Sequence, residues 1–173
     1  DHGRHRLQGR GFSLHACALR PKSRGRLCLK SADPAQPIGI HANYLSDEGG
    51  ADLRMMIEGV RLSREIFAQS PFGAHRGEEI YPGIGVQDDR AIEEFVRRKA
   101  ETIYHPVGTC RMGIDAEAVV DAELRVHGVQ GLRVVDASIM PSLPGGNTNA
   151  PTIMIAEHAA DLLLAKLPSG TGS

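Results

Sequence analysis

The sequence predicts an α+β fold, in which helices cover one side of a small antiparallel sheet. Apolar residues alternate in period 2 over residues 12–19 and again over 26–30, a pattern typical of strands. Apolar residues recur at helical spacing over residues 51–69 and 90–100, which indicates amphipathic helices. With 173 residues, the chain is long enough to bury one ordinary core.

Composition and cysteine usage exclude several classes of protein. The net charge is −1, so no basic surplus is available for a phosphate backbone and no nucleic-acid partner is expected. Three widely spaced cysteines give neither a disulfide framework nor a Cys-x-x-Cys metal pair, which favours a reducing, cytoplasmic location. No apolar run approaches the roughly 20 residues of a membrane-spanning helix. His2 and His5 lack neighbouring ligands, so no metal site is predicted.

The strand pattern comes first along the chain. Pro21 ends the alternating run over 12–19, and a tight turn at 22–25 leads into the second run, so the two runs are expected to pair as a hairpin. A short strand is predicted at 38–41, where His41 is interpreted as a surface residue.

Two amphipathic helices follow the strands. The first starts behind Asp47 and Asp52, and Asp88 or Asp89 caps the second, since aspartate favours helix starts. The intervening Gly83-Ile84-Gly85 is not a dinucleotide-binding fingerprint, because its third glycine is missing and no strand–turn–helix frame surrounds it.

His105 is a candidate functional residue because of its backbone setting. Pro106 disfavours a helical conformation at the preceding residue, so His105 is expected in extended or turn geometry at the end of an element, where side chains face clefts. Cys110 could form a Cys/His nucleophile pair with it. The five-residue spacing guarantees no contact and no orienting third residue stands out, so this alternative is disfavoured.

The β-branched run over 132–136 predicts a strand of a covered sheet. Ligands gather at the carboxyl ends of such strands, where Asp136 and Ala137 lie. Asp121 and His127 lack that position and are interpreted as turn and surface residues.

The last predicted element is a helix over residues 149–164. Asn149 or Ala150 as the cap and Pro151 in the first turn form a strong helix start. The free N–H groups at that end can hold an anion or a developing negative charge.

Two blocks carry a resemblance to a known family: 104–113, Tyr-His-Pro-Val-Gly-Thr-Cys-Arg-Met-Gly, and 145–152, Gly-Gly-Asn-Thr-Asn-Ala-Pro-Thr. Joined by 119–121 and 131–141, they closely resemble the C-terminal part of the glucose-methanol-choline (GMC) flavin oxidoreductases, and within that family the choline-dehydrogenase-like, FAD-dependent alcohol dehydrogenases. The similarity runs from about residue 11 to 166, although the relatives' Ile-Asp-Pro-Asn-Tyr reads Ile-His-Ala-Asn-Tyr here.

The resemblance implies a fragment with a definite domain organisation. After a flexible basic segment (1–10), residues 11–102 would form part of the substrate-binding domain. Residues 103–167 would form a catalytic segment that completes a Rossmann-like FAD domain, followed by a disordered tail (168–173). The N-terminal FAD-binding half, with the Gly-rich fingerprint, is missing. The chain therefore looks like a cut piece, expected to be inactive and to bind no FAD alone.

The chemistry implied by the resemblance is oxidation of a primary alcohol to an aldehyde, with hydride transfer to FAD. His105 matches the family's catalytic base, and Asn149 matches a second active-site position that is His or Asn in relatives. The residues expected to contact the flavin are Asp136, Ala137, Asn147, Thr148, Pro151 and Thr152.

The expected partners are a small alcohol, the N-terminal half of the enzyme, and a quinone or another electron acceptor rather than nicotinamide. The protein is expected in the cytoplasm, with peripheral attachment to the inner membrane as an alternative. Aromatic residues make up only 4% of the chain, which favours an uncharged alcohol over a quaternary ammonium. The alternative function is a non-catalytic binding or assembly module that is derived from such an enzyme and needs a partner chain.

Overall fold

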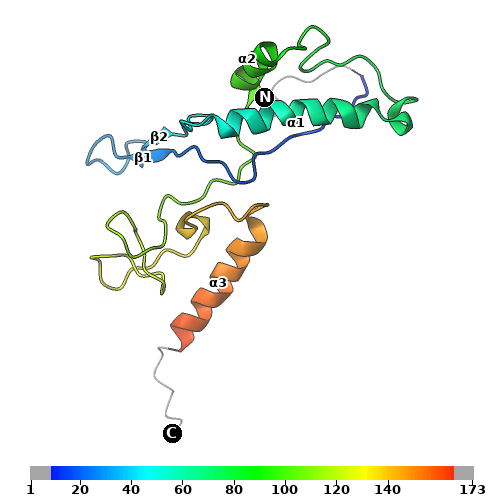
Figure 1. Ribbon diagram of the computed structural model, residues 1–173. Helices are drawn as coiled ribbons and strands as arrows, with labels where there is room; N and C mark the ends of the chain where they lie inside the picture. The colour runs from blue at the N-terminus through cyan, green and yellow to red at the C-terminus, as the bar shows by residue number, and fades with distance from the viewer. Residues whose placement is uncertain (1–8, 166–173) are drawn as a thin grey trace. The chain divides into compact units, whose positions relative to one another are not determined.

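The computed structural model describes residues 9–165, and the chain divides into two compact units, Asp1–Glu101 and Thr102–Ser173 (Figure 1). Each unit has a hydrophobic core of its own. Residues 1–8 of the predicted basic segment (1–10) and the predicted tail at 168–173 lie outside the described residues. The helices and the small antiparallel sheet agree with the predicted α+β class. The assignment of the two parts to substrate and flavin binding stays a prediction.

Unit 1 is built around two packed helices, α1 (Ala51–Ala68) and α2 (Asp89–Lys99), as the sequence predicts (Figure 1). The Asp47 carboxylate accepts the N–H of Ala51 at 2.6 Å, and Asp88 accepts the N–H of Ala91 at 2.8 Å, so aspartates satisfy the free donors at both helix starts. A one-turn 3₁₀ helix, η1 (Ser70–Phe72), follows α1. The core of the unit consists of Leu53, Ile57, Ile92 and Val96.

The sheet of unit 1 differs from the predicted hairpin. β1 (Arg26–Cys28) pairs antiparallel with β2 (Gly39–His41), with Leu27 opposite Ile40. The short strand predicted at 38–41 is confirmed, but residues 12–19 form no strand, so the predicted pairing of 12–19 with 26–30 is wrong.

The segment 12–19 packs against helical residues instead. The ring of Phe12 lies 5.0 Å from the ring of Phe67 and 5.8 Å from that of Phe72. A Cβ on Gly59 would come within 2.5 Å of the Ala16 Cβ, so the segment touches the α1 backbone there. An alternating pattern indicates that one face of an extended segment packs against something. In this case the contacts of Phe12 and Ala16 are with helical residues, and within residues 9–165 no second strand pairs with the segment.

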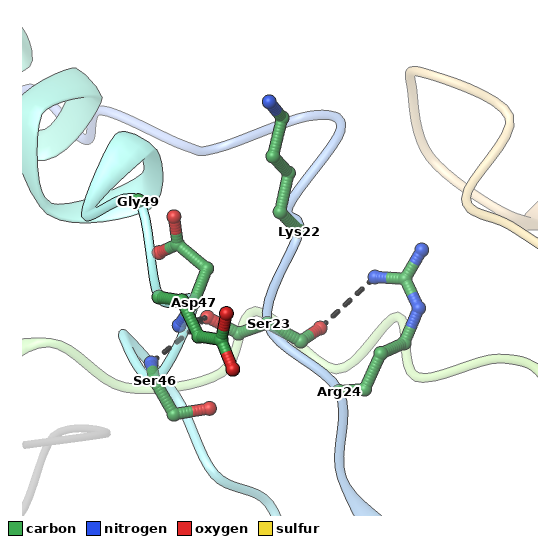
Figure 2. A pocket seen from close by; sticks show the side chains of 7 residues that line it. Lys22, Ser23, Arg24, Ser46, Asp47 and Gly49 are labelled. Atoms are coloured by element: carbon green, nitrogen blue, oxygen red, sulfur yellow. Dashed lines mark hydrogen bonds between the residues drawn. The ribbon is translucent and has the colours of Figure 1, made fainter.

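A buried carboxylate fastens the turn before β1 to the start of α1. Asp52, 3% exposed, accepts the backbone N–H groups of Lys22 and Ser23 at 2.8 and 2.9 Å and the Ser23 hydroxyl at 2.6 Å. Ser23 Oγ in turn accepts the N–H groups of Ser46 and Asp47, at 2.9 and 3.2 Å (Figure 2). An open hollow of about 450 Å³ lies beside this turn, and its lining includes Lys22, Ser23, Ser46 and Asp47 of this network.

The described part of unit 2, residues 102–165, contains two helical elements, the one-turn η2 (Ala137–Ile139) and α3 (Asn149–Leu164) (Figure 1). The predicted C-terminal helix is therefore confirmed. No helix within residues 9–165 combines the length and apolar character needed to cross a bilayer. The core of unit 2 draws on both helical elements and on the loops before them, and consists of Val120, Leu124, Ile139, Met140, Ile155 and Ala159.

The predicted strand at 132–136 is not formed. Its backbone makes one isolated bridge, between Arg125 and Arg133, and Leu132 and Val135 are exposed. A covered strand needs neighbouring strands and packed faces, and within the described residues this segment has a single bridge. The β-branched composition was therefore not enough to make a strand here.

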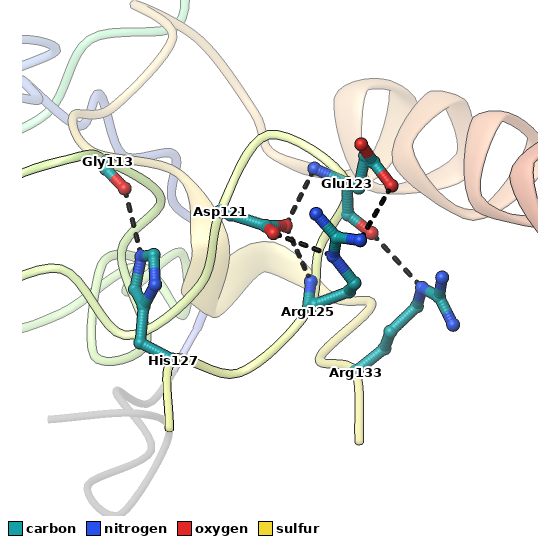
Figure 3. Close-up of polar contacts among 6 residues, drawn as sticks. All are labelled: Gly113, Asp121, Glu123, Arg125, His127 and Arg133. Carbon is teal, nitrogen blue, oxygen red and sulfur yellow. Dashed lines mark hydrogen bonds and ion pairs between the residues drawn. The ribbon is translucent and has the colours of Figure 1, made fainter. Parts of the chain in front are cut away.

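Asp121 and His127 have the turn and surface roles that the sequence predicts. Asp121 accepts the N–H of Glu123 at 2.8 Å and both the N–H and Nε of Arg125, at 2.9 and 2.8 Å (Figure 3). The backbone N–H of Arg125 contributes most to holding the Asp121 pKa down at about 2, with its guanidinium and the Glu123 N–H adding to it. His127 is exposed, and its Nε2 lies 3.1 Å from the Gly113 carbonyl oxygen.

Candidate active site

His105 lies in an irregular loop, as Pro106 predicts. The preceding residue, Tyr104, has φ +69°, and its N–H donates to Thr102 Oγ1 at 2.9 Å. A tyrosine in the left-handed region is uncommon, so the chain turns sharply immediately before the histidine. The His105 side chain is half-buried.

The loop after His105 is fixed to η2 by backbone hydrogen bonds. Cys110 N–H donates to the Ser138 carbonyl at 3.0 Å, and Met112 N–H donates to the Ile139 carbonyl at 2.8 Å. Gly108 adopts φ +89°, and a Cβ there would lie 3.2 Å from the Met140 carbonyl oxygen. The block 104–113 and η2 are therefore one connected structure.

Asp136 and Ala137 lie in this connected structure. Asp136 is exposed and caps η2 by accepting the N–H of Ser138 at 2.8 Å, and Ala137 is the first residue of η2. The structure thus places both near the histidine loop in the fold, at a 3₁₀ turn rather than at the end of a strand. Their assignment to the flavin stays a prediction.

A direct contact joins His105 to the start of α3. The Thr148 hydroxyl lies 2.8 Å from His105 Nδ1, and the Thr148 side chain is 7% exposed. Its neighbours Asn147 and Asn149 are both exposed. The structure therefore brings together His105 and the Asn-Thr-Asn segment, two features that the sequence analysis placed at one site.

The helix start differs by one residue from the prediction. Thr148, rather than Asn149 or Ala150, occupies the cap position, and its side chain makes no capping bond. Instead the Thr148 carbonyl accepts both the N–H of Thr152, at 3.0 Å, and its hydroxyl, at 2.7 Å. The predicted cap is therefore wrong, and the Thr148 side chain contacts His105, which is 43 positions away in sequence.

The first turn of α3 has the chemistry of a site for an electron-rich group. Pro151 lies in it as predicted, and it contains no acidic residue. N–H groups at a helix start without a side-chain cap are donors for an anion or a polarised carbonyl. Clusters of three or more His, Cys, Asp or Glu side chains with metal-site geometry do not occur within residues 9–165.

Sequence reasoning missed the interaction between Thr148 and His105. Thr148 was expected to contact the flavin, and its hydroxyl faces the histidine. The two residues are 43 positions apart, and an Asn-Thr-Asn run before a helix looks like a capping sequence. No local signal predicts the contact.

Comparison with known families identifies the class of protein. A family model described as GMC oxidoreductase matches residues 21–156. The chain belongs to this family.

Curated relatives agree with the family. The alcohol dehydrogenase [acceptor] of Pseudomonas putida is 53% identical over 167 residues, which span 96% of this chain and 30% of the relative. The mitochondrial choline dehydrogenase of Mus musculus is 52% identical over 165 residues, 94% of this chain and 27% of the relative. The chain therefore spans less than a third of the length of these relatives.

Solved structures show the same fold. Pyridoxine 4-oxidase from Mesorbium loti aligns with a TM-score of 0.79 at 33% identity, over 87% of this chain and 29% of that structure. An FAD-dependent oxidoreductase from Chaetomium thermophilum aligns with a TM-score of 0.77 at 30% identity, over 86% and 26%. At these identities the likeness extends to the family as well as to the fold.

Proposed function

We propose that this chain supplies the catalytic base and one wall of the flavin site in an FAD-dependent oxidoreductase that converts a primary alcohol to an aldehyde. The observation that carries the proposal is the contact between His105 and Thr148, which sets the histidine beside the exposed Asn147 and Asn149 at the start of α3. Support comes from the family match and from relatives that are alcohol and choline dehydrogenases.

His105 is the proposed base. Oxidation of an alcohol needs a group that removes the hydroxyl proton while the carbon loses hydride, and a neutral imidazole can accept a proton near physiological pH. Nδ1 of His105 is engaged by Thr148, which leaves Nε2 to take the proton. The half-buried position limits water around the ring without closing it off.

Asn149 is the proposed donor to the substrate oxygen. It is exposed at the first residue of α3 and directly follows the threonine that contacts His105. An amide N–H can stabilise alkoxide charge as it develops, and it does not compete for the proton.

FAD is the proposed cofactor, and when bound it supplies the acceptor for hydride. The chain's donor set fits an electron-rich ring edge, because the α3 start carries N–H groups and no acidic residue in its first turn. The residues that would hold FAD are the predicted set, Asp136, Ala137, Asn147, Thr148, Pro151 and Thr152. A quinone or a related compound is the proposed final electron acceptor.

Residues 103–167 are proposed to complete a Rossmann-like FAD domain together with an N-terminal part. α3 exposes large apolar side chains on several sides, at Ile153, Met154, Leu163 and Leu164. A helix that is apolar all round is usually covered on all sides. The FAD-binding part of the enzyme is the proposed cover, in a cytoplasmic protein or one bound peripherally at the inner membrane.

The same exposed apolar residues favour the second candidate, a non-catalytic assembly module that binds a partner chain. The two candidates differ in their dependence on His105. An assembly module would lose partner binding when Ile153 or Met154 is replaced by a charged residue, and would be unaffected by His105→Ala.

The test is His105→Ala in the full-length enzyme, in which this chain is joined to an N-terminal FAD-binding part. The rate of flavin reduction by alcohol in stopped flow should fall by roughly 10² to 10⁴, the usual contribution of a general base, while FAD stays bound. The wild-type rate should rise with pH through one ionisation, and this dependence should vanish in the variant. His75→Ala, at an exposed turn position away from α3, is the matched control and should keep the wild-type rate.

An unchanged rate and pH profile in His105→Ala would remove the histidine from the mechanism. For the second residue, Asn149→Ala should cost about 10-fold or more, the loss of one donor to the developing charge. Asn149→His should retain activity, since the imidazole N–H can donate in its place.

A further inference from the structure

We propose that Thr148 is a positioning residue for His105: its buried hydroxyl holds the imidazole by Nδ1, so that Nε2 is the nitrogen that takes the substrate proton. This inference rests on the proposed role of His105 as the base. It assigns to Thr148 a function other than flavin contact through its side chain.

The contact is short and shielded. The Thr148 oxygen lies 2.8 Å from Nδ1, near the most common hydrogen-bond length, and the residue is 7% exposed between two exposed asparagines. The Thr148 side chain is buried while Asn147 and Asn149 on either side are exposed, and its hydroxyl contacts the ring of His105. The hydroxyl therefore fixes the ring of a histidine that otherwise lies in an irregular loop.

The hydroxyl is not used as a helix cap. Threonine at the position before a helix usually accepts the N–H of the second or third helical residue. Thr148 occupies that position and makes no side-chain cap, and the third helical residue, Pro151, has no N–H to donate. The side chain contacts His105 instead.

The two polar groups of Thr148 near Nδ1 are not equivalent. The Thr148 N–H lies 3.5 Å from Nδ1, beyond the usual 2.7–3.2 Å range, and it can only donate. The hydroxyl at 2.8 Å can donate or accept. The hydroxyl contact is therefore the stronger one, and of the two groups only the hydroxyl can accept a hydrogen bond from a protonated Nδ1.

Use of Nε2 as the base makes the accepting role of the hydroxyl necessary. A neutral imidazole carries one N–H, so Nε2 can take the proton of the alcohol only when the ring hydrogen is on Nδ1. The O–H bond of the alcohol then breaks, a new N–H bond forms at Nε2, and both ring nitrogens are donors. Before and after this step Nδ1–H needs an acceptor, and Thr148 Oγ1 is at hydrogen-bond distance. An apolar side chain of the same shape would leave that donor unsatisfied in a partly buried site, at a free-energy cost.

The experiment is a double-mutant cycle in the full-length enzyme, with flavin reduction by alcohol measured in stopped flow. Thr148→Val keeps the branched shape and removes the hydroxyl, and it should slow the reaction by about 10- to 100-fold, as expected for a group that orients a catalytic side chain. Thr148→Ser keeps the hydroxyl and should remain within a few-fold of wild type. In the His105→Ala background, Thr148→Val should cost nothing further, because a positioning residue acts only through the side chain that it positions.

The cycle separates this inference from the proposed function. If His105→Ala has no effect, the base assignment fails and this inference fails with it. If His105→Ala is slow and Thr148→Val is as fast as wild type, only the inference is overturned. An equal loss from Thr148→Val in both backgrounds also overturns it, because a purely structural role predicts that outcome.

A second readout uses the 173-residue chain without cofactor. The ¹⁵N resonances of labelled histidine, assigned to His105 by their loss in His105→Ala, report the protonation and hydrogen bonding of each ring nitrogen. The Nδ1 resonance should shift in Thr148→Val and stay near its wild-type position in Thr148→Ser. Identical spectra in the wild type and Thr148→Val would overturn the proposal, and far-UV circular dichroism of each variant verifies that the fold is intact.

Discussion

At the scale of a residue, the Asp52 side chain connects the turn before β1 to the start of α1. Burial by itself raises the pKa of this carboxyl, but the Ser23 hydroxyl and the N–H groups of Lys22 and Ser23 outweigh burial, and the pKa lies below its usual 3.8. Three hydrogen bonds converge on one buried carboxylate, so the turn before β1 and the start of α1 depend on its charge. Such bonds to charged groups are individually among the strongest in proteins.

We predict that Asp52→Asn destabilises the chain by about 1.5–3 kcal/mol near neutral pH, the usual worth of hydrogen bonds to a charged group. Because the pKa is lower in the folded state, the carboxylate stabilises the fold above the unfolded pKa and loses this effect as the pH falls below 3.8. Urea unfolding followed by circular dichroism should therefore show a gap between wild type and variant at about pH 7 that narrows at about pH 3.

The matched control is Asp33→Asn. Asp33 is exposed, and its carboxylate accepts a local N–H, that of Ala35. Its replacement should change the unfolding free energy by less than about 0.5 kcal/mol at either pH. A gap between wild type and Asp52→Asn that is the same at both pH values would contradict the linkage to ionisation.

At the scale of elements, the alternating segment 12–19 packs against α1 and does not form a strand. Gly59 leaves room on α1 for Ala16, since a Cβ at Gly59 would lie only 2.5 Å from the Ala16 Cβ. Glycine inside a helix costs about 1 kcal/mol relative to alanine, so the close approach is made at the expense of helix propensity.

We predict that Gly59→Ala is destabilising although it improves helix propensity. The gain of about 1 kcal/mol is opposed by overlap of two methyl groups, and overpacking costs about 1–3 kcal/mol. Ala16→Gly added to Gly59→Ala removes the overlap and should make the double variant more stable than Gly59→Ala. Thermal unfolding of the four members of this cycle measures the coupling. Additive effects would show that the segment does not pack on α1.

At the scale of the whole molecule, the chain accounts for under a third of the length of its relatives and exposes apolar residues on α3. The strongest sequence marker of an FAD site, a Gly-rich phosphate loop between a strand and a helix, does not occur in these 173 residues. The residues proposed to face the flavin ring therefore come without a cradle for its pyrophosphate in this chain.

We predict that the purified 173-residue chain binds no stoichiometric FAD and does not reduce artificial acceptors with alcohols, because the phosphate-binding part is outside it. Absorbance of the flavin in the visible range, with the mass of the preparation verified, is the measurement. Co-expression with the portion of the Pseudomonas putida relative that the chain does not match should yield a yellow complex. Bound FAD in the chain alone would contradict this division of roles.

The sequence by itself determined the local features of this protein. The three helices were predictable because periodicity and capping act over a few residues, as at Asp88 before α2. The short strand β2 and the irregular backbone at His105 were predictable for the same reason. The GMC family followed from ordered motifs, and with it the hypotheses for His105 and Asn149, which stay predictions.

Only the tertiary structure decided the features that depend on distant residues. The run at 12–19 packs on α1 rather than in a sheet, and the run at 132–136 lacks the neighbours that would make it a strand. Thr148 contacts a histidine 43 positions away instead of capping its own helix. Alternation and β-branching indicate which conformations a segment can adopt. Whether the segment pairs as a strand or packs on a helix depends on the residues that bury it and form hydrogen bonds with it, and those residues are distant in sequence.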